Sequence, residues 1–328
     1  MNDDKGGLPD FIIIGAAKAG TTSLAKYLAR LPDIFVTTPK EPEFFARDDV
    51  HARGLDWYRG LYAQARPSQL RGEASTLYSL ATLFPRTVPR MAAVVPEVKL
   101  IYVLREPVAR AYSYYVQLQK NYRRWTGDNS IHRSFEDFLT DRPGRASRDK
   151  ALGPHDAHLP DTPDLLVDGS DYLRQLRVYL AHFDRDRMLF LTFEELSRQP
   201  HQAFSRIHAF LGLPDPAPDA GLPRENISAQ DFARLRQDHS LQDATARMPW
   251  LKALGTVLPA PLRQRGRKGL ARLAASLTPA DRGTPPPLLV STRDALQTRF
   301  AADRAELAQL TGLDLDHWWG PATVKRSA

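Results

Sequence analysis

The sequence predicts an α/β fold in which a mainly parallel central sheet is flanked by helices. Short apolar runs lie at residues 11–14, 98–104 and 188–193, the first of them rich in β-branched residues, and the segments between them carry apolar side chains at helical spacing. Strands that alternate with helices are typical of a parallel sheet, because each parallel connection needs a long crossover. With 328 residues, 42% of them hydrophobic, the chain can bury the core of a single domain over residues 1–328.

The first predicted strand runs into a loop of small residues from Gly15 to Gly20, followed by a helix over residues 24–30. Small residues let the main chain approach an anion closely, and the N–H groups of a helix's first turn attract negative charge. Three hydroxyl groups follow the loop, on Thr21, Thr22 and Ser23. This arrangement predicts a phosphate-binding loop of the P-loop type.

The lysine of this loop differs in position from that of a Walker A loop. A Walker A loop has lysine directly after its second glycine, followed by the Ser or Thr that binds magnesium. Here Thr21 follows Gly20, and Lys18 lies within the loop. At that position a lysine can reach the terminal group of a bound nucleotide without magnesium. The alternative is an ordinary strand-to-helix turn with Lys18 in solvent.

A short strand is predicted at residues 34–36, and Lys40 and Glu41 fall in the loop after it. Ligands of open α/β sheets bind at the carboxyl ends of the strands, so a carboxylate here is expected to face the nucleotide. A carboxylate can act as a general base when burial raises its pKa. Glu41 is the candidate base, Glu43 is its rival in the same loop, and a solvated acidic loop is the alternative without function.

Helical spacing continues at residues 51–62, where Trp57 is expected either to pack onto the core or to stack on a sugar. Residues 70–75 predict another strand that ends in a loop. A helix punctuated by prolines comes next, before the buried strand at residues 98–104.

Arg105 stands at the end of the strand 98–104, and Pro107 opens a helix that carries Ser113 about two turns in. A guanidinium at the strand end and a hydroxyl on the helix can bind one phosphate from two directions. Arg110 is an alternative phosphate ligand or an exposed helix charge. For Arg105 the alternative is a structural ion pair.

These motifs together resemble those of sulfotransferases that use 3′-phosphoadenosine-5′-phosphosulfate (PAPS). Residues 15–23 resemble the family's 5′-phosphosulfate loop, and residues 39–45 resemble the segment with the catalytic glutamate in the heparan-sulfate and bacterial carbohydrate branch. Residues 54–58 and 72–75 follow in the family's order, and residues 104–115 resemble its 3′-phosphate motif. The resemblance implies a P-loop-type fold and sulfuryl transfer from PAPS to a hydroxyl or amine of a carbohydrate or glycolipid, with release of adenosine 3′,5′-bisphosphate (PAP).

The resemblance also implies roles for individual residues. Glu41 is the expected base, and Lys18 is expected to neutralise charge on the bridging oxygen and the leaving 5′-phosphate. The donor is expected to be bound by Lys18, Ala19, Gly20, Thr21, Thr22, Ser23, Arg105 and Ser113. On the acceptor side we expect Lys40, Trp57 and Tyr172, with packing as an equal alternative for Tyr172. No metal ion is expected.

The sequence departs from the heparan-sulfate enzymes after the glutamate that matches Glu73. Those enzymes have a lysine there, and Ala74 cannot supply its charge. The chain also has no cysteine, so it lacks the disulfide-tied loop by which that branch covers the nucleotide. The departure at Ala74 favours a bacterial type of enzyme. Without the disulfide-tied loop, the residues that close over the donor within 224–285 are not assigned.

The second half of the chain begins with a polar region, residues 121–168, that is expected to be irregular and to line the acceptor. Only residues 134–139 look helical there, with Ser134 and Asp137 as a capping box. Its histidines are expected at the surface, although the family's small-molecule branch uses a histidine base; they are His132, His155 and His158. Helices at residues 170–180, 203–211 and 292–310 and a strand at residues 188–193 are predicted beyond it.

The net charge of +7 is compatible with an anionic ligand, and no nucleic-acid motif accompanies it. Residues 229–285 predict a helical basic C-terminal extension with no acidic residue from 247 to 277. It is expected either to cover the core or to contact a membrane or acidic acceptor. No signal peptide or membrane span is recognised, so a soluble, cytoplasmic protein with at most peripheral membrane contact is expected. Residues 1–9 and 322–328 are expected to be disordered.

Other functions remain open at this point. A small-molecule secondary metabolite is the alternative acceptor. A nucleoside-phosphate kinase or NTPase is disfavoured by the position of Lys18 and by the lack of an acidic strand end for magnesium. A non-catalytic nucleotide-binding protein is disfavoured by the presence of Glu41 beside Lys18. The sequence does not indicate an oligomeric state.

Overall fold

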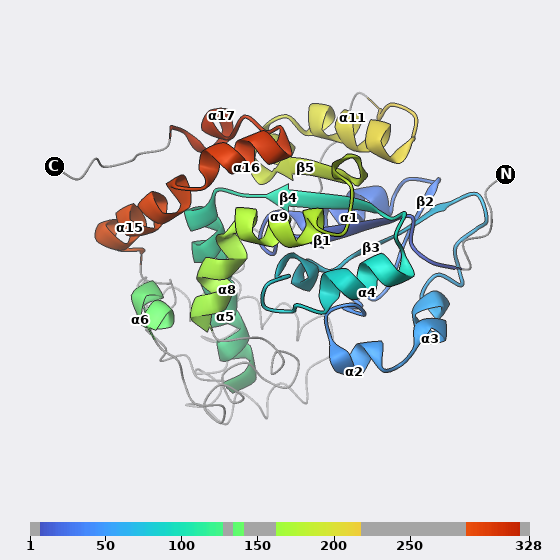
Figure 1. Cartoon of the computed structure of the whole chain (residues 1–328), viewed down its shortest axis with the longest axis horizontal. Coiled ribbons are helices and arrows are strands. Elements are labelled where there is room, and N and C mark those ends of the chain that lie inside the picture. The colour runs from blue at the N-terminus through green and yellow to red at the C-terminus, as the bar shows by residue number, and fades with distance from the viewer. Residues whose placement is uncertain (1–6, 127–133, 141–161, 218–286, 322–328) are drawn as a thin grey trace, which may run out of the picture.

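The computed structural model describes residues 7–126, 134–140, 162–217 and 287–321 (Figure 1). Its strands form one five-stranded sheet with the order β2-β3-β1-β4-β5, and every neighbouring pair is parallel. The strands are β1 (Phe11–Gly15), β2 (Ile34–Val36), β3 (Leu70–Ala74), β4 (Lys99–Leu104) and β5 (Met188–Thr192). The predicted fold class, a parallel sheet flanked by helices, is confirmed.

The helices follow the strands in the alternation that the sequence predicts. They are α1 (Thr21–Leu28), α2 (Asp48–His51), α3 (Leu55–Gly60), α4 (Thr87–Val94), α5 (Pro107–Thr126), α6 (Phe135–Thr140), α8 (Thr162–Val167), α9 (Tyr172–Leu180), α10 (Phe193–Arg198), α11 (Pro200–Leu211), α15 (Val290–Ala301), α16 (Arg304–Thr311) and α17 (Leu315–Trp319). Short 3₁₀ turns are η1 (Thr76–Ser79), η2 (Asp168–Ser170) and η3 (Arg185–Arg187). At α6 the predicted capping box is present, since the main-chain N–H of Asp137 donates to Ser134 Oγ at 3.0 Å and that of Ser134 donates to Asp137 Oδ2 at 2.7 Å.

The core has two parts. The larger cluster surrounds the sheet and includes the four apolar residues of β1, while a second cluster joins α5, α6, α8 and α15. Close packing fixes one glycine in β3, because a Cβ at Gly72 would lie 2.1 Å from the ring of Phe11. The strand that carries the phosphate-binding loop is therefore held on both sides by buried neighbours.

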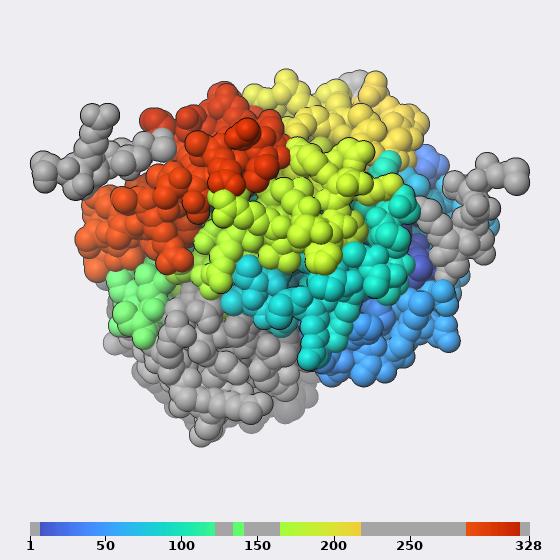
Figure 2. Space-filling view, viewed as in Figure 1, coloured from blue at the N-terminus to red at the C-terminus, as the bar shows by residue number. Residues whose placement is uncertain are grey.

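The C-terminal helices lie directly against residues 165–217 on the molecular surface (Figure 2). Arg177 on α9 forms an ion pair with Glu306 on α16 at 2.7 Å. Arg185 Nε donates to the main-chain oxygen of Leu310 at 2.7 Å. These contacts attach the end of the chain to the β5 side of the sheet.

Some predicted boundaries are wrong. The helix expected at 292–310 is two helices, because Asp303 leaves helical geometry (φ −97°, ψ 0°). The break coincides with a change of packing partner, since Leu296 belongs to the second cluster and Leu307 to the main core. The helix expected within 51–62 is likewise divided, with Gly54 at φ 86° before α3.

The region 121–168 is more helical than predicted. α5 continues to Thr126, and α8 spans Thr162–Val167. Proline fits the first turn of a helix, and Pro163 follows the first residue of α8. Leu165 and Leu166 are buried, so α8 is stabilised by its apolar contacts.

Several predictions lie outside the described residues. They are the disorder of most of 1–9 and of 322–328, most of the acceptor-side region with its three histidines, the loop from residue 224 and the basic extension at 229–285. No helix within the described ranges has the length and apolar character needed to cross a membrane.

Candidate functional site

The predicted site residues gather at the carboxyl ends of three adjacent strands, β3, β1 and β4. The loop with Lys18 follows β1, and Arg105 follows β4. Glu41 reaches the end of β3, where its main-chain N–H donates to the carbonyl of Ala74 at 3.1 Å. From β1 the chain moves to one side of the sheet and from β4 to the other, and such a switch point is where open α/β sheets bind ligands.

The loop between β1 and α1 is tightly packed. The main-chain N–H of Ala16 donates to the carbonyl of Val103 in β4 at 2.8 Å, and that of Ala19 donates to the carbonyl of Ala16 at 3.1 Å. Gly20 caps α1 in the left-handed region (φ 87°), and a Cβ there would lie 3.1 Å from the ring of Phe193. Side-chain hydrogen bonds do not cap this helix, so its first-turn N–H groups are available to an anion.

The hydroxyl residues of the loop differ in exposure. Thr21 and Ser23 are buried, whereas Thr22 is partly exposed at the start of α1. All three lie in the first turn, together with the N–H groups that the sequence predicts to bind a phosphate.

Lys18 is held at both its main chain and its side chain. Its Nζ donates to Gln117 Oε1 on α5 at 3.2 Å, and its carbonyl accepts from Arg105 Nη1 at 2.9 Å. Ser113 lies four residues before Gln117 and so shares its face of α5. Hydrogen bonds therefore connect Arg105, Lys18 and Gln117, and Ser113 lies on the helix face that carries Gln117.

Arg105 lies against the ring of Phe193, with Cζ 4.6 Å from the ring centroid. Burial lowers the pKa of Arg105, and the nearby carboxylate of Glu194 opposes that shift. A guanidinium remains charged at neutral pH even so. The Glu194 carboxylate has other hydrogen-bond donors, since it accepts from the main-chain N–H of Glu106 at 3.2 Å and from Trp319 Nε1 at 3.1 Å. The guanidinium is therefore positioned by a ring and a carbonyl.

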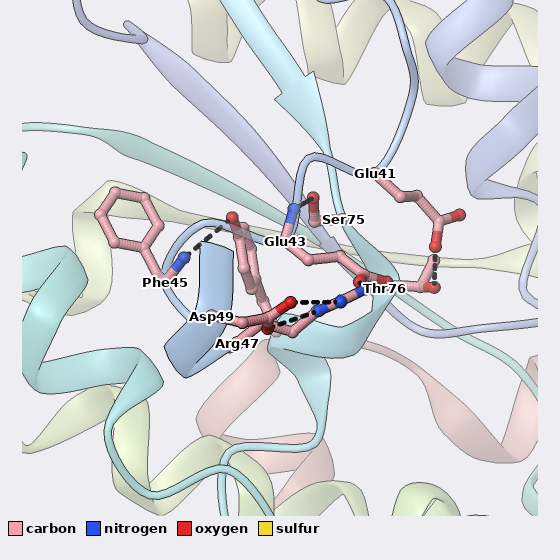
Figure 3. Close-up of polar contacts among 8 residues, drawn as sticks. Glu41, Glu43, Phe45, Arg47, Asp49, Ser75 and Thr76 are labelled. Atoms are coloured by element: carbon pink, nitrogen blue, oxygen red, sulfur yellow. Dashed lines mark hydrogen bonds and ion pairs between the residues drawn. The ribbon is translucent and has the colours of Figure 1, made fainter. Parts of the chain in front are cut away.

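The Glu41 carboxylate has a partner on each oxygen. Lys40 Nζ donates to Oε1. Thr76 Oγ1 donates to Oε2 at 3.1 Å (Figure 3). The Glu41 side chain is 34% exposed, so it can still be reached from solvent. Hydrogen-bond donors on both oxygens keep such a carboxylate in one orientation.

Glu43 has a different environment. Its main-chain N–H donates to Ser75 Oγ at 3.3 Å, and its carboxylate pairs with Arg47, which also binds Asp49 (Figure 3). Its side chain is 17% exposed. The rival glutamate is thus engaged in an ion-pair network, whereas Glu41 is the more accessible of the two.

Backbone conformation separates the two motifs from the rest of the described chain. Among the residues that the structure describes, the non-glycine residues with positive φ are Lys18 (71°), Glu41 (65°) and Glu43 (56°). The left-handed region is unfavourable for side chains of this kind, and such residues cluster at functional sites. The strained positions are the lysine and the two glutamates that the sequence singles out.

Two predicted acceptor-side residues have packing contacts. Trp57 is partly buried, with Arg53 stacked at 4.0 Å from its ring centroid and Phe44 at 6.1 Å. Tyr172 is 2% exposed, and its hydroxyl donates to the carbonyl of Arg105 at 2.9 Å and accepts from the N–H of that residue at 3.2 Å. These contacts favour the packing alternative for Tyr172, which holds the strand end that carries Arg105.

Arg110 fits neither of its sequence interpretations. It is 1% exposed, and its guanidinium donates to Ser170 Oγ at 2.7 Å and to the carbonyls of Leu165 and Leu166 at 2.7 and 3.0 Å. It therefore ties α5 to α8 and η2 and is not an exposed charge.

Sequence reasoning missed three neighbours of the site: Thr76, Gln117 and Phe193. Thr76 directly follows the motif 72–75, and Phe193 directly follows β5, so the rule that ligands gather at strand ends could have found both. Gln117 is one helical turn beyond Ser113, and the same face of α5 indicates it.

The comparisons with known proteins agree with this geometry. The family model described as "Sulfotransferase domain" matches residues 8–269. The chain belongs to the sulfotransferase domain family. This member is similar to the crystal structure of a sulfotransferase from Alicyclobacillus acidocaldarius, with a TM-score of 0.52 and 29% identity over 71% of this chain and 92% of that one. The predicted resemblance to sulfotransferases is confirmed.

Curated relatives of this sulfotransferase family member include heparan sulfate enzymes. It is 32% identical over 207 residues to heparan sulfate glucosamine 3-O-sulfotransferase 3B1 of Mus musculus, covering 63% of this chain and 46% of that protein. It is 27% identical over 222 residues to the bifunctional heparan sulfate N-deacetylase/N-sulfotransferase 1 of Caenorhabditis elegans, covering 66% of this chain and 23% of that protein. The chain thus spans about half the length, or less, of these relatives.

Within the described ranges, no three His, Cys, Asp or Glu side chains are grouped to hold a metal ion.

Proposed function

We propose that the protein transfers a sulfuryl group from PAPS to a hydroxyl or amine of a saccharide or glycolipid. One observation carries the proposal: the strained positions of the described chain are Lys18, Glu41 and Glu43, and they lie at the carboxyl ends of adjacent strands. Strain of about 1–3 kcal/mol per residue persists only where the surrounding structure compensates for it, and active sites are where it is usually found.

The order of the strand ends matches the order of groups along the donor. Glu41 lies at the β3 end, Lys18 at the β1 end and Arg105 at the β4 end. Neighbouring strands are about 4.8 Å apart, so these side chains can serve the transferred sulfuryl group, the 5′-phosphate and the 3′-phosphate of one nucleotide. In the proposal Ala19, Gly20, Thr21, Thr22 and Ser23 surround the 5′-phosphosulfate, and Ser113 assists Arg105.

The proposed reaction is an in-line displacement at sulfur. The acceptor oxygen or nitrogen forms a bond to sulfur, while the bond from sulfur to the 5′-phosphate oxygen breaks and PAP leaves with that electron pair. Glu41 takes the proton of the acceptor. Lys18 and the first-turn N–H groups of α1 stabilise the negative charge that develops on the leaving oxygen.

Two observations support a saccharide as the acceptor class. The curated relatives carry heparan sulfate in their names, and the segment 39–45 resembles the corresponding branch. Lys40 and Trp57 lie on or near the Glu41 loop, where a cation and an aromatic ring could bind an acidic sugar. Ala74 in place of the lysine of the heparan-sulfate enzymes distinguishes the site from theirs.

Calorimetry without magnesium tests the donor, and labelled PAPS tests the transfer. We expect PAP to bind more tightly than AMP or ATP, because only PAP carries a 3′-phosphate for Arg105. With heparosan, N-sulfated heparosan and a glycolipid mixture as probes, radiolabel is expected in a saccharide fraction. A preference for ATP would favour a kinase or NTPase. Binding of PAP without transfer to any of these probes would refute the saccharide or glycolipid acceptor.

A further inference from the structure

The turn after β3 holds the Glu41 loop through a row of hydroxyl groups. Thr76 Oγ1 donates to the Glu41 carboxylate at 3.1 Å, Ser75 Oγ accepts from the N–H of Glu43 at 3.3 Å, and Tyr78 Oη accepts from the N–H of Phe45 at 3.4 Å (Figure 3). Alternate residues of the loop are thus each bonded to one short turn. Ser75 and Tyr78 hold the main chain, whereas Thr76 holds the functional side chain itself.

The turn is itself firmly attached to the sheet. The N–H of Ser75 donates to the carbonyl of Ile13 in β1 at 3.1 Å. Ser79 Oγ donates to the carbonyl of Thr76 at 2.8 Å, and a Cβ on Gly15 would lie 2.4 Å from that of Ser79. The Thr76 hydroxyl is therefore fixed relative to the loop that carries Lys18.

We propose that Thr76 is a positioning residue for Glu41, an inference that rests on the proposed role of Glu41 as base. A threonine hydroxyl both donates and accepts, so it can bond the carboxylate before proton transfer and the carboxylic acid afterwards. Lys40, the partner of the other oxygen, can only donate and has a long flexible side chain. Thr76 is thus the partner that keeps Glu41 oriented in both protonation states.

Thr76→Val removes the hydroxyl at nearly unchanged volume, and Thr76→Ser keeps it. We expect Thr76→Val to lower kcat roughly 10- to 100-fold, because small misplacements of a reacting group have effects of that size. The KM for acceptor and the Kd for PAP are expected to change less than about threefold. Thr76→Ser should restore most of kcat. The matched control is Thr298→Val on α15, whose hydroxyl bonds only a main-chain carbonyl in its own helix.

A double-mutant cycle with Glu41→Gln separates positioning from general damage. If Thr76 acts through Glu41, Thr76→Val should lower kcat little further in the Glu41→Gln background. Equal losses in both backgrounds, or unchanged kcat in Thr76→Val, would overturn the inference.

The same cycle in urea-induced unfolding tests the contact without any acceptor. Non-additive shifts of the unfolding free energy support the bond from Thr76 to Glu41, and additive shifts overturn it. Failure of the proposed function gives a different result, since the wild-type protein would then bind no PAP or transfer no label.

Discussion

Arg105 and Lys18 are bonded to each other across 87 residues of sequence: the Arg105 guanidinium donates to the Lys18 carbonyl at 2.9 Å. The bond joins the end of β4 to the loop after β1, and it holds a lysine whose φ is 71°. Any change at Arg105 is therefore expected to affect both the proposed 3′-phosphate ligand and the conformation of the loop.

Arg105→Ala is expected to weaken PAP binding roughly 10- to 100-fold, the usual effect of losing a charge-assisted hydrogen bond. Arg105→Lys should recover only part of it, because an ammonium cannot reproduce the paired N–H groups of a guanidinium. Calorimetry with PAP and AMP makes the test specific. If Arg105 binds the 3′-phosphate, the loss is larger for PAP than for AMP, and equal losses would assign the effect to the loop instead.

Lys18→Ala is expected to reduce turnover more than donor affinity, because the lysine is proposed to act on charge that appears in the transition state. A loss of roughly 100-fold in kcat is in the range for one electrostatic stabiliser. The measurement pairs kcat with the Kd for PAP. Gln117→Ala is an informative companion, since it frees Lys18 Nζ from its bond on α5 without removing the charge. An unchanged kcat in Lys18→Ala would refute the proposed role.

Glu41→Gln is expected to lower kcat roughly 10²- to 10⁴-fold, the usual contribution of a general base, with PAP binding nearly unchanged. The control is Glu43→Gln, in the same loop and also at positive φ. Because the Glu43 carboxylate is paired with Arg47, this variant is expected to lose stability more than turnover. The reverse pattern would make Glu43 the base.

Much of the site could be predicted because its residues follow strands that the sequence shows clearly. Lys18 and Arg105 stand directly after apolar runs, and parallel strands bring their carboxyl ends together. The strand order then places them side by side. Sequence pattern was sufficient for these positions because each depends on one local element.

The remaining contacts depend on packing between distant segments. Arg110 lies on a helix whose residue spacing does not show whether this side chain is buried. Its buried guanidinium is bonded to Ser170, which is 60 residues away in the sequence. The bond from Thr76 to Glu41 requires the turn after β3 to meet the loop after β2. No periodicity or local motif specifies such pairs, so side-chain partners could not be assigned before the fold was known.

Glu73 offers a prediction about stability. It lies in β3 with 0% exposure, and Tyr62 Oη donates to its carboxylate at 3.2 Å. The buried tyrosines Tyr58 and Tyr78 also surround it, and they favour the ionised form. Burial outweighs these hydrogen bonds and raises the pKa of Glu73 from 4.5 to about 7.

The sign of the pH effect follows from the proton that the folded state retains. Between pH 4.5 and about 7 the unfolded chain releases the Glu73 proton while the folded protein keeps it. Stability from this group is thus fully present below pH 4.5 and lost as the pH rises through about 7. The total is on the order of 3 kcal/mol.

Glu73→Gln replaces the carboxyl by a neutral group of similar shape that does not titrate. The variant is expected to gain stability relative to the wild type as the pH rises from about 5 to about 8, by an amount on the order of 3 kcal/mol. Urea unfolding at several pH values measures the difference, and Glu306→Gln at the exposed surface of α16 is the control for a carboxylate that is not buried. A difference between Glu73→Gln and the wild type that stays constant with pH would show that Glu73 is ionised in the folded protein across that range.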